Sequence, residues 1–214
     1  MSHFVDSVAI DLTADSTQHA RVIDAALDCL SLYGLSKTTV DDIAKAASIS
    51  PATVYRLFPG GKQALIDELC QRELQAFVAE LVEVTSGVHD LDELLVTAIS
   101  FASCALLEHP VVSHLMRREP EALIALLTFD RFDAALELIR SVGSPLAVRF
   151  VDRQTAEELS EWVARMVVSL AFAPGFVDPS DRVAVRRVVC DYLNPSFTHQ
   201  HPLQSAQGAS DVRN

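Results

Sequence analysis

The chain has 214 residues; half of them are apolar, 21% are charged, and the mean hydropathy is +0.23. This composition excludes a chain that is disordered over most of its length. Glycine is scarce while alanine, leucine and glutamate are common, which predicts an all-α protein. The longest predominantly apolar stretch without a charge, 94–107, is too short for a membrane-spanning helix of about 20 apolar residues, and the acidic N-terminus does not resemble a signal peptide. We therefore expect a cytoplasmic protein with no membrane partner.

The net charge of −12 is unevenly distributed along the chain. Residues 74–194 contain ten lysines and arginines against eighteen aspartates and glutamates, whereas residues 37–62 contain four against two. A basic segment in an otherwise acidic protein permits a small DNA-contacting module but does not establish one. The four cysteines lie far apart and form no CxxC pair, which favours reduced, buried thiols.

Three helices are predicted near the N-terminus. The first covers 19–33, carries its apolar residues on one face, and ends at Gly34. The second covers 40–47 behind a threonine N-cap, and the third covers 51–58 behind a serine N-cap, with proline at its first position. Two short helices joined by three residues have the dimensions of a helix-turn-helix, but also those of a plain αα-hairpin inside a larger bundle.

The residues of these two helices, and those just after them, resemble a known family. Residues 39–47 read TVDDIAKAA, residues 49–58 read ISPATVYRLF, and residues 62–65 read KQAL. In sequence and spacing, these segments resemble the DNA-binding domain of the TetR family of bacterial transcriptional regulators. Two glycines at 60–61 make the loop look one residue longer than is usual in the family, and Gln63 replaces the usual glutamate.

This resemblance implies an all-α fold in two parts. A three-helix, helix-turn-helix DNA-binding domain is expected at 18–61, followed by a helical effector-binding and dimerisation domain at 62–194, with about nine helices in total. Residues 1–17 would form a polar arm and residues 195–214 a polar tail. The implied function is that of a dimeric, sequence-specific transcriptional repressor, which a small effector releases from a pseudo-palindromic operator in double-stranded DNA.

The helix after the turn is expected to enter the major groove with its N-terminal residues at the base edges. The hydroxyls of Thr53 and Tyr55 suit phosphate oxygens, and Arg56 can bind a guanine bidentately or a phosphate. Asp41 and Asp42 are expected on the exposed face of the preceding helix, where they weaken the case for phosphate contacts. The resemblance maps DNA contacts onto Thr39, Ser50, Pro51, Ala52, Thr53, Tyr55, Arg56 and Lys62.

The second part of the chain is expected to contain the effector pocket. Its helices are predicted at 62–86, 90–108, 110–117, 119–141 and 145–151. The uncharged stretch and the aromatic residues near it could line an apolar cavity, and they are equally compatible with an ordinary core. We expect an apolar effector, such as a fatty-acyl or polycyclic molecule, in a pocket formed by Phe77, Phe101, His109, His114, Phe129 and Phe132.

The last two helices are expected to form the dimer. Residues 155–173 predict a helix that is apolar on two sides and so must be covered on two sides. Another helix is predicted after the capping sequence DPSD at 178–181. The family resemblance likewise implies a four-helix interface between two protomers. Its expected residues are Trp162, Val163, Met166, Val167, Leu170, Val185, Val188, Val189 and Tyr192.

Enzyme chemistry finds little support in the sequence. His109 and His114 are five positions apart with a proline between them, so they cannot share a helix face as zinc ligands would. We expect no catalytic residue, no metal site and no cofactor. The alternative function is that of a helical small-molecule-binding protein, or a redox sensor that uses Cys104 or Cys190, whose helix-turn-helix does not read DNA.

Overall fold

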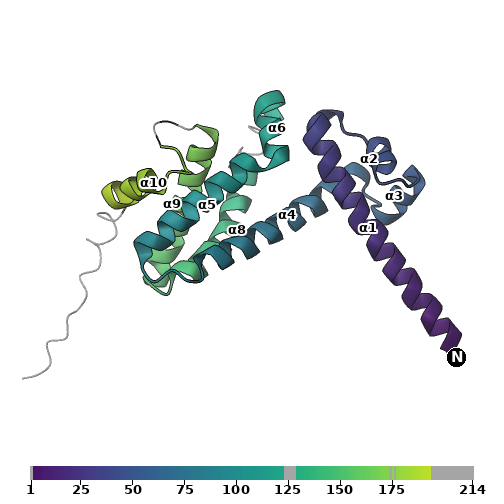
Figure 1. Cartoon of the computed structure of the whole chain (residues 1–214), viewed down its shortest axis with the longest axis horizontal. Helices are drawn as coiled ribbons and strands as arrows, with labels where there is room; N and C mark the ends of the chain where they lie inside the picture. The colour runs from purple at the N-terminus through teal and green to yellow at the C-terminus, as the bar shows by residue number, and fades with distance from the viewer. Residues whose placement is uncertain (1, 123–128, 174, 176, 194–214) are drawn as a thin grey trace, which may run out of the picture.

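A computed structural model describes residues 2–122, 129–173, 175 and 177–193 of the chain. Within these ranges every regular element is an α-helix, apart from one π-helical turn at Val189–Leu193. The predicted all-α fold is therefore confirmed. Figure 1 shows a small N-terminal group of helices (α1, α2 and α3) and a larger C-terminal group (α5 to α10), with the long helix α4 running from one to the other.

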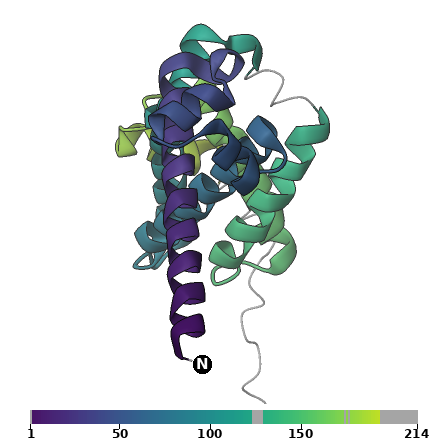
Figure 2. The ribbon, with the colours of Figure 1, turned by 90° about the vertical axis from the view of Figure 1, so that its right-hand side faces the viewer.

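The first helix, α1, spans Ser2–Lys37 and is much longer than the predicted helix at 19–33. Its N-terminal half extends beyond the helix-turn-helix as a straight rod, with its end marked N in Figures 1 and 2. The prediction began where the apolar periodicity begins, but an established helix continues at little cost into residues that lack such a pattern. The predicted stop at Gly34 is confirmed, because this residue is non-helical with φ +83° and ψ 177°.

The helix-turn-helix consists of α2, Val40–Ala46, and α3, Pro51–Leu57, packed on α1. Their apolar residues form one core with α1 and with Leu65 and Leu69 of α4, Gly61–Thr85. Ile43, Val54 and Phe58 are at most 2% exposed in this core. Because neither short helix could bury enough apolar surface alone, α1 and α4 complete the domain.

The C-terminal domain contains α5, Leu91–Glu108; α6, Pro110–Arg118; α8, Phe129–Ala147; α9, Arg153–Phe172; and α10, Arg182–Val188. Its core is formed mainly by α5, α9 and α10, and α8 packs along α9. Asp90 caps α5 as the sequence predicts, with Oδ1 accepting the Glu93 N–H at 2.8 Å.

The predicted boundaries near residues 119–151 need correction. Helix α8 does not end near residue 141, as predicted, but continues through Pro145 to Ala147, so no separate helix occupies 145–151. Pro145 cannot donate a helical hydrogen bond and its ring crowds the carbonyl four residues earlier, and α8 ends two residues after it. Part of the helix predicted at 119–141, residues 123–128, lies outside the described residues.

The two domains are joined at the end of α1 by the α1 hook, which we define as residues 34–37. Ser36 donates its N–H and its hydroxyl to Oε2 of Glu119, at 3.1 and 2.9 Å. Glu119 is the C-cap of α6 and is only 7% exposed. Val111 of α6 also packs against the N-terminal core. The C-terminal domain therefore holds the DNA-binding domain through α6 as well as through α4.

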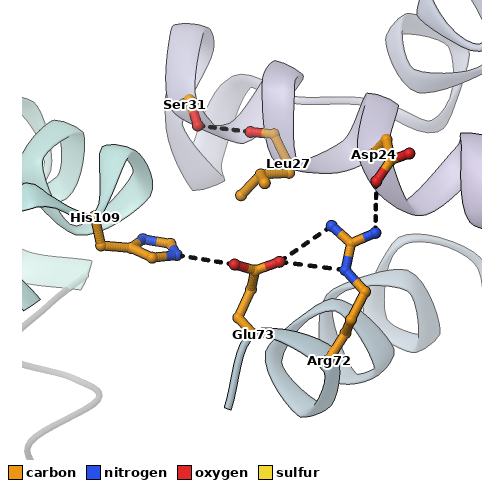
Figure 3. A network of polar contacts seen from close by, with 6 residues as sticks. All are labelled: Asp24, Leu27, Ser31, Arg72, Glu73 and His109. Atoms are coloured by element: carbon orange, nitrogen blue, oxygen red, sulfur yellow. Dashed lines mark hydrogen bonds and ion pairs between the residues drawn. The ribbon is translucent and has the colours of Figure 1, made fainter. Parts of the chain in front are cut away.

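A polar network adds a second link between the domains (Figure 3). Arg72 of α4 binds Asp24 of α1 at 2.6 Å and its own neighbour Glu73 at 3.1 Å. The other carboxylate oxygen of Glu73 lies 3.5 Å from Nε2 of His109, at the junction of α5 and α6. Single exposed ion pairs stabilise little. Together, however, these contacts connect α1, α4 and the α5–α6 junction.

The buried serine Ser103 of α5 leads to a stability prediction. Its side chain is fully buried, and its hydroxyl has no hydrogen-bond partner among the described residues. We expect Ser103→Ala to raise the free energy of unfolding by about 1 kcal/mol and Tm by about 2–4 °C, because an unsatisfied buried hydroxyl is removed. Ser160→Ala is the matched control, since the Ser160 hydroxyl donates to the Ala156 carbonyl at 2.7 Å. Equal changes in Tm for both variants in a thermal melt would contradict this prediction.

Candidate DNA-binding surface and ligand cavity

The second helix begins with a complete capping box. The Thr39 hydroxyl accepts the Asp42 N–H at 3.2 Å, and the Asp42 carboxylate accepts the Thr39 N–H at 3.0 Å and its hydroxyl at 2.5 Å. These hydrogen bonds from Thr39, first from its side chain and then from its backbone, hold the pKa of Asp42 below its ordinary value. Asp42 therefore has a capping role that explains an acidic residue on this surface.

The third helix presents the predicted DNA-contacting residues on its outer face. Ser50 caps it, with the hydroxyl accepting the Thr53 N–H at 3.2 Å and lying 2.9 Å from the Thr53 hydroxyl. Pro51, Ala52 and Arg56 are exposed, as is Tyr55 with 52% of its surface, whereas Val54 on the opposite side is buried. This face is free of core packing and can approach base edges in a major groove.

Lys62 has a contact that the sequence analysis did not predict. Its ammonium group donates to the carbonyl of Leu35 in the α1 hook at 2.5 Å, and the residue is half-buried. This bond ties the first turn of α4 to the end of α1. It uses one of the three donors of the ammonium group. The phosphate contact predicted for Lys62 would therefore have to coexist with a role inside the domain.

A cavity of about 210 Å³ lies within the C-terminal domain. Its described walls come from four helices: Leu74, Phe77, Val78 and Leu81 of α4; Leu94, Leu95, Ala98, Ala102 and Leu106 of α5; Ile139, Val142, Gly143, Leu146 and Ala147 of α8; and Leu159, Ser160, Val163, Ala164, Val167 and Val168 of α9. Among these residues Ser160 alone has a polar side chain, and its hydroxyl is already bonded within α9. A site without free polar groups favours an apolar occupant.

The structure separates the residues of the predicted effector pocket. Phe77 lines the cavity, but Phe101 and His109 lie on a separate outer groove, and Phe101 stacks on Phe77 with ring centroids 5.7 Å apart. His114 faces Gly34 of the α1 hook instead. The side chains of Phe129 and Phe132 lie outside the described residues.

Aliphatic and small residues form most of the described wall of the cavity, and Phe77 is the one predicted pocket residue among them. Ala98, Ala102 and Leu106 recur every four residues along α5 within the uncharged stretch. This repeat was the signal in the sequence that could have identified the wall, because it leaves room on one side of an apolar helix.

The predicted dimer residues divide into two groups. Leu170, Val185 and Val189 are at most 6% exposed and belong to the core of a single protomer, and Val167, 9% exposed, lines the cavity. These four positions have little surface to offer a partner, because packing within the protomer already covers them. Partly exposed positions are Trp162, Val163, Met166 and Val188, while the side chain of Tyr192 lies outside the described residues.

The surroundings of Cys104 bear on the alternative function of a redox sensor. Burial, with Glu108 and Asp178 adding to it, raises the pKa of the Cys104 thiol, which disfavours the reactive thiolate that a redox sensor needs.

No described helix is by itself long and apolar enough to cross a membrane. Helices α5 and α6 reach that length and apolarity only together, as a pair bent by 65°.

Comparison with known proteins supports the DNA-binding interpretation. Residues 22–69 match the family model of bacterial regulatory proteins of the tetR family. Over 196 residues the chain is 28% identical to Rv1255c, an uncharacterized HTH-type transcriptional regulator of Mycobacterium tuberculosis H37Rv, in a match that covers 86% of this chain and 91% of that protein.

Solved structures share the fold. The TetR family repressor AlkX from Dietzia sp. strain DQ12-45-1b, implicated in biodegradation of n-alkanes, is similar with a TM-score of 0.59 and 23% identity over 83% of this chain and 95% of that one. FadR from Bacillus subtilis, solved in complex with stearoyl-CoA, is similar with a TM-score of 0.52 and 18% identity over 79% of this chain and 96% of that one.

The helix-turn-helix with its exposed α3 and the helical domain behind it are the architecture of a DNA-binding transcriptional regulator. Residues 22–69 match the DNA-binding domain of the tetR family of bacterial regulators, and the fold of the chain is that of solved members of this family. The resemblance to the TetR family is thereby borne out over residues 22–69, and the all-α fold predicted from the sequence is confirmed. Regulators of this family bind operator DNA and small effectors.

Proposed function

We propose that this TetR-family regulator is a homodimeric repressor that acts in the cytoplasm and leaves its operator when a small apolar effector fills the cavity. The course of α4 carries the proposal. Leu65 and Leu69 of α4 belong to the DNA-binding core, and Leu74, Phe77 and Leu81, further along the same helix, line the cavity. A molecule in the cavity therefore contacts α4, the same helix that supports the DNA-binding domain.

The apolar class of the effector is supported by the walls of the cavity and by two similar proteins. The described walls contain no charged side chain that could pair with an ionic group. AlkX is a repressor implicated in the biodegradation of n-alkanes, and FadR from Bacillus subtilis was crystallised with stearoyl-CoA. These ligands and substrates all contain long hydrocarbon chains, which this cavity would suit.

Release of the operator requires that the effector bind more tightly to a conformation of the protein to which DNA binds weakly. Two recognition helices must lie about 34–36 Å apart to occupy successive major grooves. A change in the tilt of α4 would alter this spacing, and the contacts of the α1 hook with Lys62 and Glu119 would transmit the change. The effector lowers operator affinity only by the ratio of its affinities for the two conformations, and operator DNA lowers effector affinity by the same factor.

The DNA-reading role of α3 is tested by Arg56→Ala. Loss of a bidentate contact to guanine should cost about 1–3 kcal/mol of operator binding and relax specificity at one position. Arg153→Ala, at an exposed position on α9 far from the helix-turn-helix, is the matched control and should bind as the wild type does. Titrations of operator and random DNA over a range of salt concentrations measure both effects. Equal losses on both DNAs would reduce Arg56 to a phosphate contact.

The effector site is tested by Ala102→Phe, which places a ring in the cavity. Ala102 is 8% exposed and lines the wall on α5. With methyl decanoate as the neutral acyl probe, we expect the variant to need at least about tenfold more probe to release operator, because the ring takes the space of the ligand. Ala79→Phe, at an exposed position of α4 outside the cavity, is the control. If methyl decanoate never releases the wild-type protein, the apolar effector is refuted.

A further inference from the structure

An open groove lies on another face of the α4–α5 pair, separate from the apolar cavity. Its volume is about 680 Å³, and its third wall is the segment that leads into α10, with Pro179, Ser180 and Arg182. Along α5 the groove contacts Thr97, Ser100 and Cys104, whereas the cavity contacts Ala98 and Ala102. Only Phe77 is shared between the described walls of the two sites.

The groove contains a buried hydroxyl that lacks a partner. Ser100 is 7% exposed, lines the groove, and its Oγ forms no hydrogen bond with any described residue. Elsewhere in the protein such hydroxyls bond within their own helix: Ser31 of α1, Thr85 of α4 and Ser160 of α9 each donate to the carbonyl four residues earlier. Because an unsatisfied buried hydroxyl costs free energy, its presence in the wall of a groove points to a ligand that supplies the missing bond.

The charged residues along the groove indicate whether that ligand is a cation or an anion. Glu73, Glu80 and Glu108 line it; Glu73 is paired with Arg72 and lies beside His109, but no described residue forms an ion pair with Glu80 or Glu108. Arg182 is the only arginine or lysine among the described lining residues. Its guanidinium is already bound to Glu93 at 2.5 Å and to the Thr97 hydroxyl at 3.1 Å. The groove therefore attracts a cation and repels an anion.

The stacked rings of Phe77 and Phe101 supply the apolar part of the site. Both residues line the groove, with ring planes 26° apart. Aromatic faces attract ammonium groups and also pack against hydrocarbon. A ligand with an ammonium group and a hydrocarbon part therefore gains affinity from both interactions.

We propose that this outer groove is a second ligand site, which binds an amphipathic primary amine in its ammonium form. The hydrocarbon part of the ligand packs on Phe77 and Phe101, the ammonium donates to the Ser100 hydroxyl, and Glu80 and Glu108 balance its charge. The site goes beyond the apolar effector of the proposed function and does not depend on it, because the two share only the edge formed by Phe77.

The test is calorimetric titration of the full-length protein, without DNA, with three probes of one shape. 4-Phenylbutylammonium is a cation, 4-phenylbutanol is neutral with a hydroxyl in place of the ammonium group, and 4-phenylbutanoate is an anion. We expect the ammonium to bind about tenfold more tightly than the alcohol, because hydrogen bonds to charged groups are the stronger ones, and the carboxylate to bind more weakly than both. Affinity for the ammonium should fall as salt concentration rises.

Matched variants locate the site. The double variant Glu80→Gln/Glu108→Gln should weaken ammonium binding about tenfold and leave alcohol binding unchanged, and Ser100→Ala should weaken both. Ser103→Ala and Glu83→Gln are controls on the same two helices, since Ser103 is buried with an unpaired hydroxyl and Glu83 is exposed, yet neither lines the groove. Both controls should bind the ammonium as the wild type does.

Three outcomes would overturn this second site: equal affinities for ammonium and alcohol, ammonium binding that survives in the double carboxylate variant, or equal losses in Ser100→Ala and Ser103→Ala. The apolar effector is judged separately, by release of operator with methyl decanoate. Failure of the amine site with successful release, or the reverse, therefore identifies which proposal is wrong.

Discussion

Replacing Gly34 by alanine is expected to lower the free energy of unfolding by about 3 kcal/mol or more. At φ +83° and ψ 177°, Gly34 occupies a backbone region that is essentially closed to residues with a side chain. A Cβ atom there would also overlap Oε1 of Glu119 and lie 2.8 Å from Nε2 of His114. Glu119 would have to move, and its buried carboxylate would lose the two hydrogen bonds from Ser36.

Chemical denaturation measures this loss, with Gly87→Ala as the matched control. No atom lies within 4 Å of a Cβ built at Gly87, so that variant should differ from the wild type by less than about 0.5 kcal/mol. Because the α1 hook joins α6 to the DNA-binding domain, we also expect Gly34→Ala to weaken the response of operator binding to the effector. Similar unfolding midpoints for the two variants would show that the contact between α6 and the hook is not tight.

The second large effect is expected for Val188→Asp in α10, which should convert the proposed dimer into folded monomers. Val188 is partly exposed, so it can contact a partner, and a two-fold axis would bring both new carboxylates into the interface. Unpaired charges buried there cost several kcal/mol. A monomer reads only one half-site, so we expect operator affinity to fall at least about 100-fold.

Sedimentation and operator titration test this prediction, with Val148→Asp as the control. Val148 is 45% exposed after α8 and is not among the residues expected at the interface. A dimeric Val188→Asp protein with wild-type affinity would place the interface elsewhere. Val167→Asp should behave differently from both, because Val167 lines the cavity inside one protomer and its charge would destabilise the fold.

The local architecture of the helix-turn-helix could be predicted from the sequence alone. Thr39 with Asp42, and Ser50 with Thr53, act within three residues of chain, so the pattern of residue types already contains both partners. The same holds for Gly34, whose left-handed backbone follows from its lack of a side chain. Spaced identities in this segment were enough to indicate the family that the comparisons confirm.

Contacts between distant residues were decided only by the tertiary structure. Lys62 and Leu35 are 27 positions apart, and Ser36 and Glu119 are 83 apart, so no local pattern pairs them. Helix α9 is apolar on two sides, and periodicity cannot say which side faces the cavity and which could face a partner; packing against α5 and α8 assigns Val167 to the cavity. The sequence by itself determined how α2, α3 and α5 begin, because those capping interactions span a single turn. Which surfaces those helices bury depends on their packing geometry, and that arises only when the whole chain is folded.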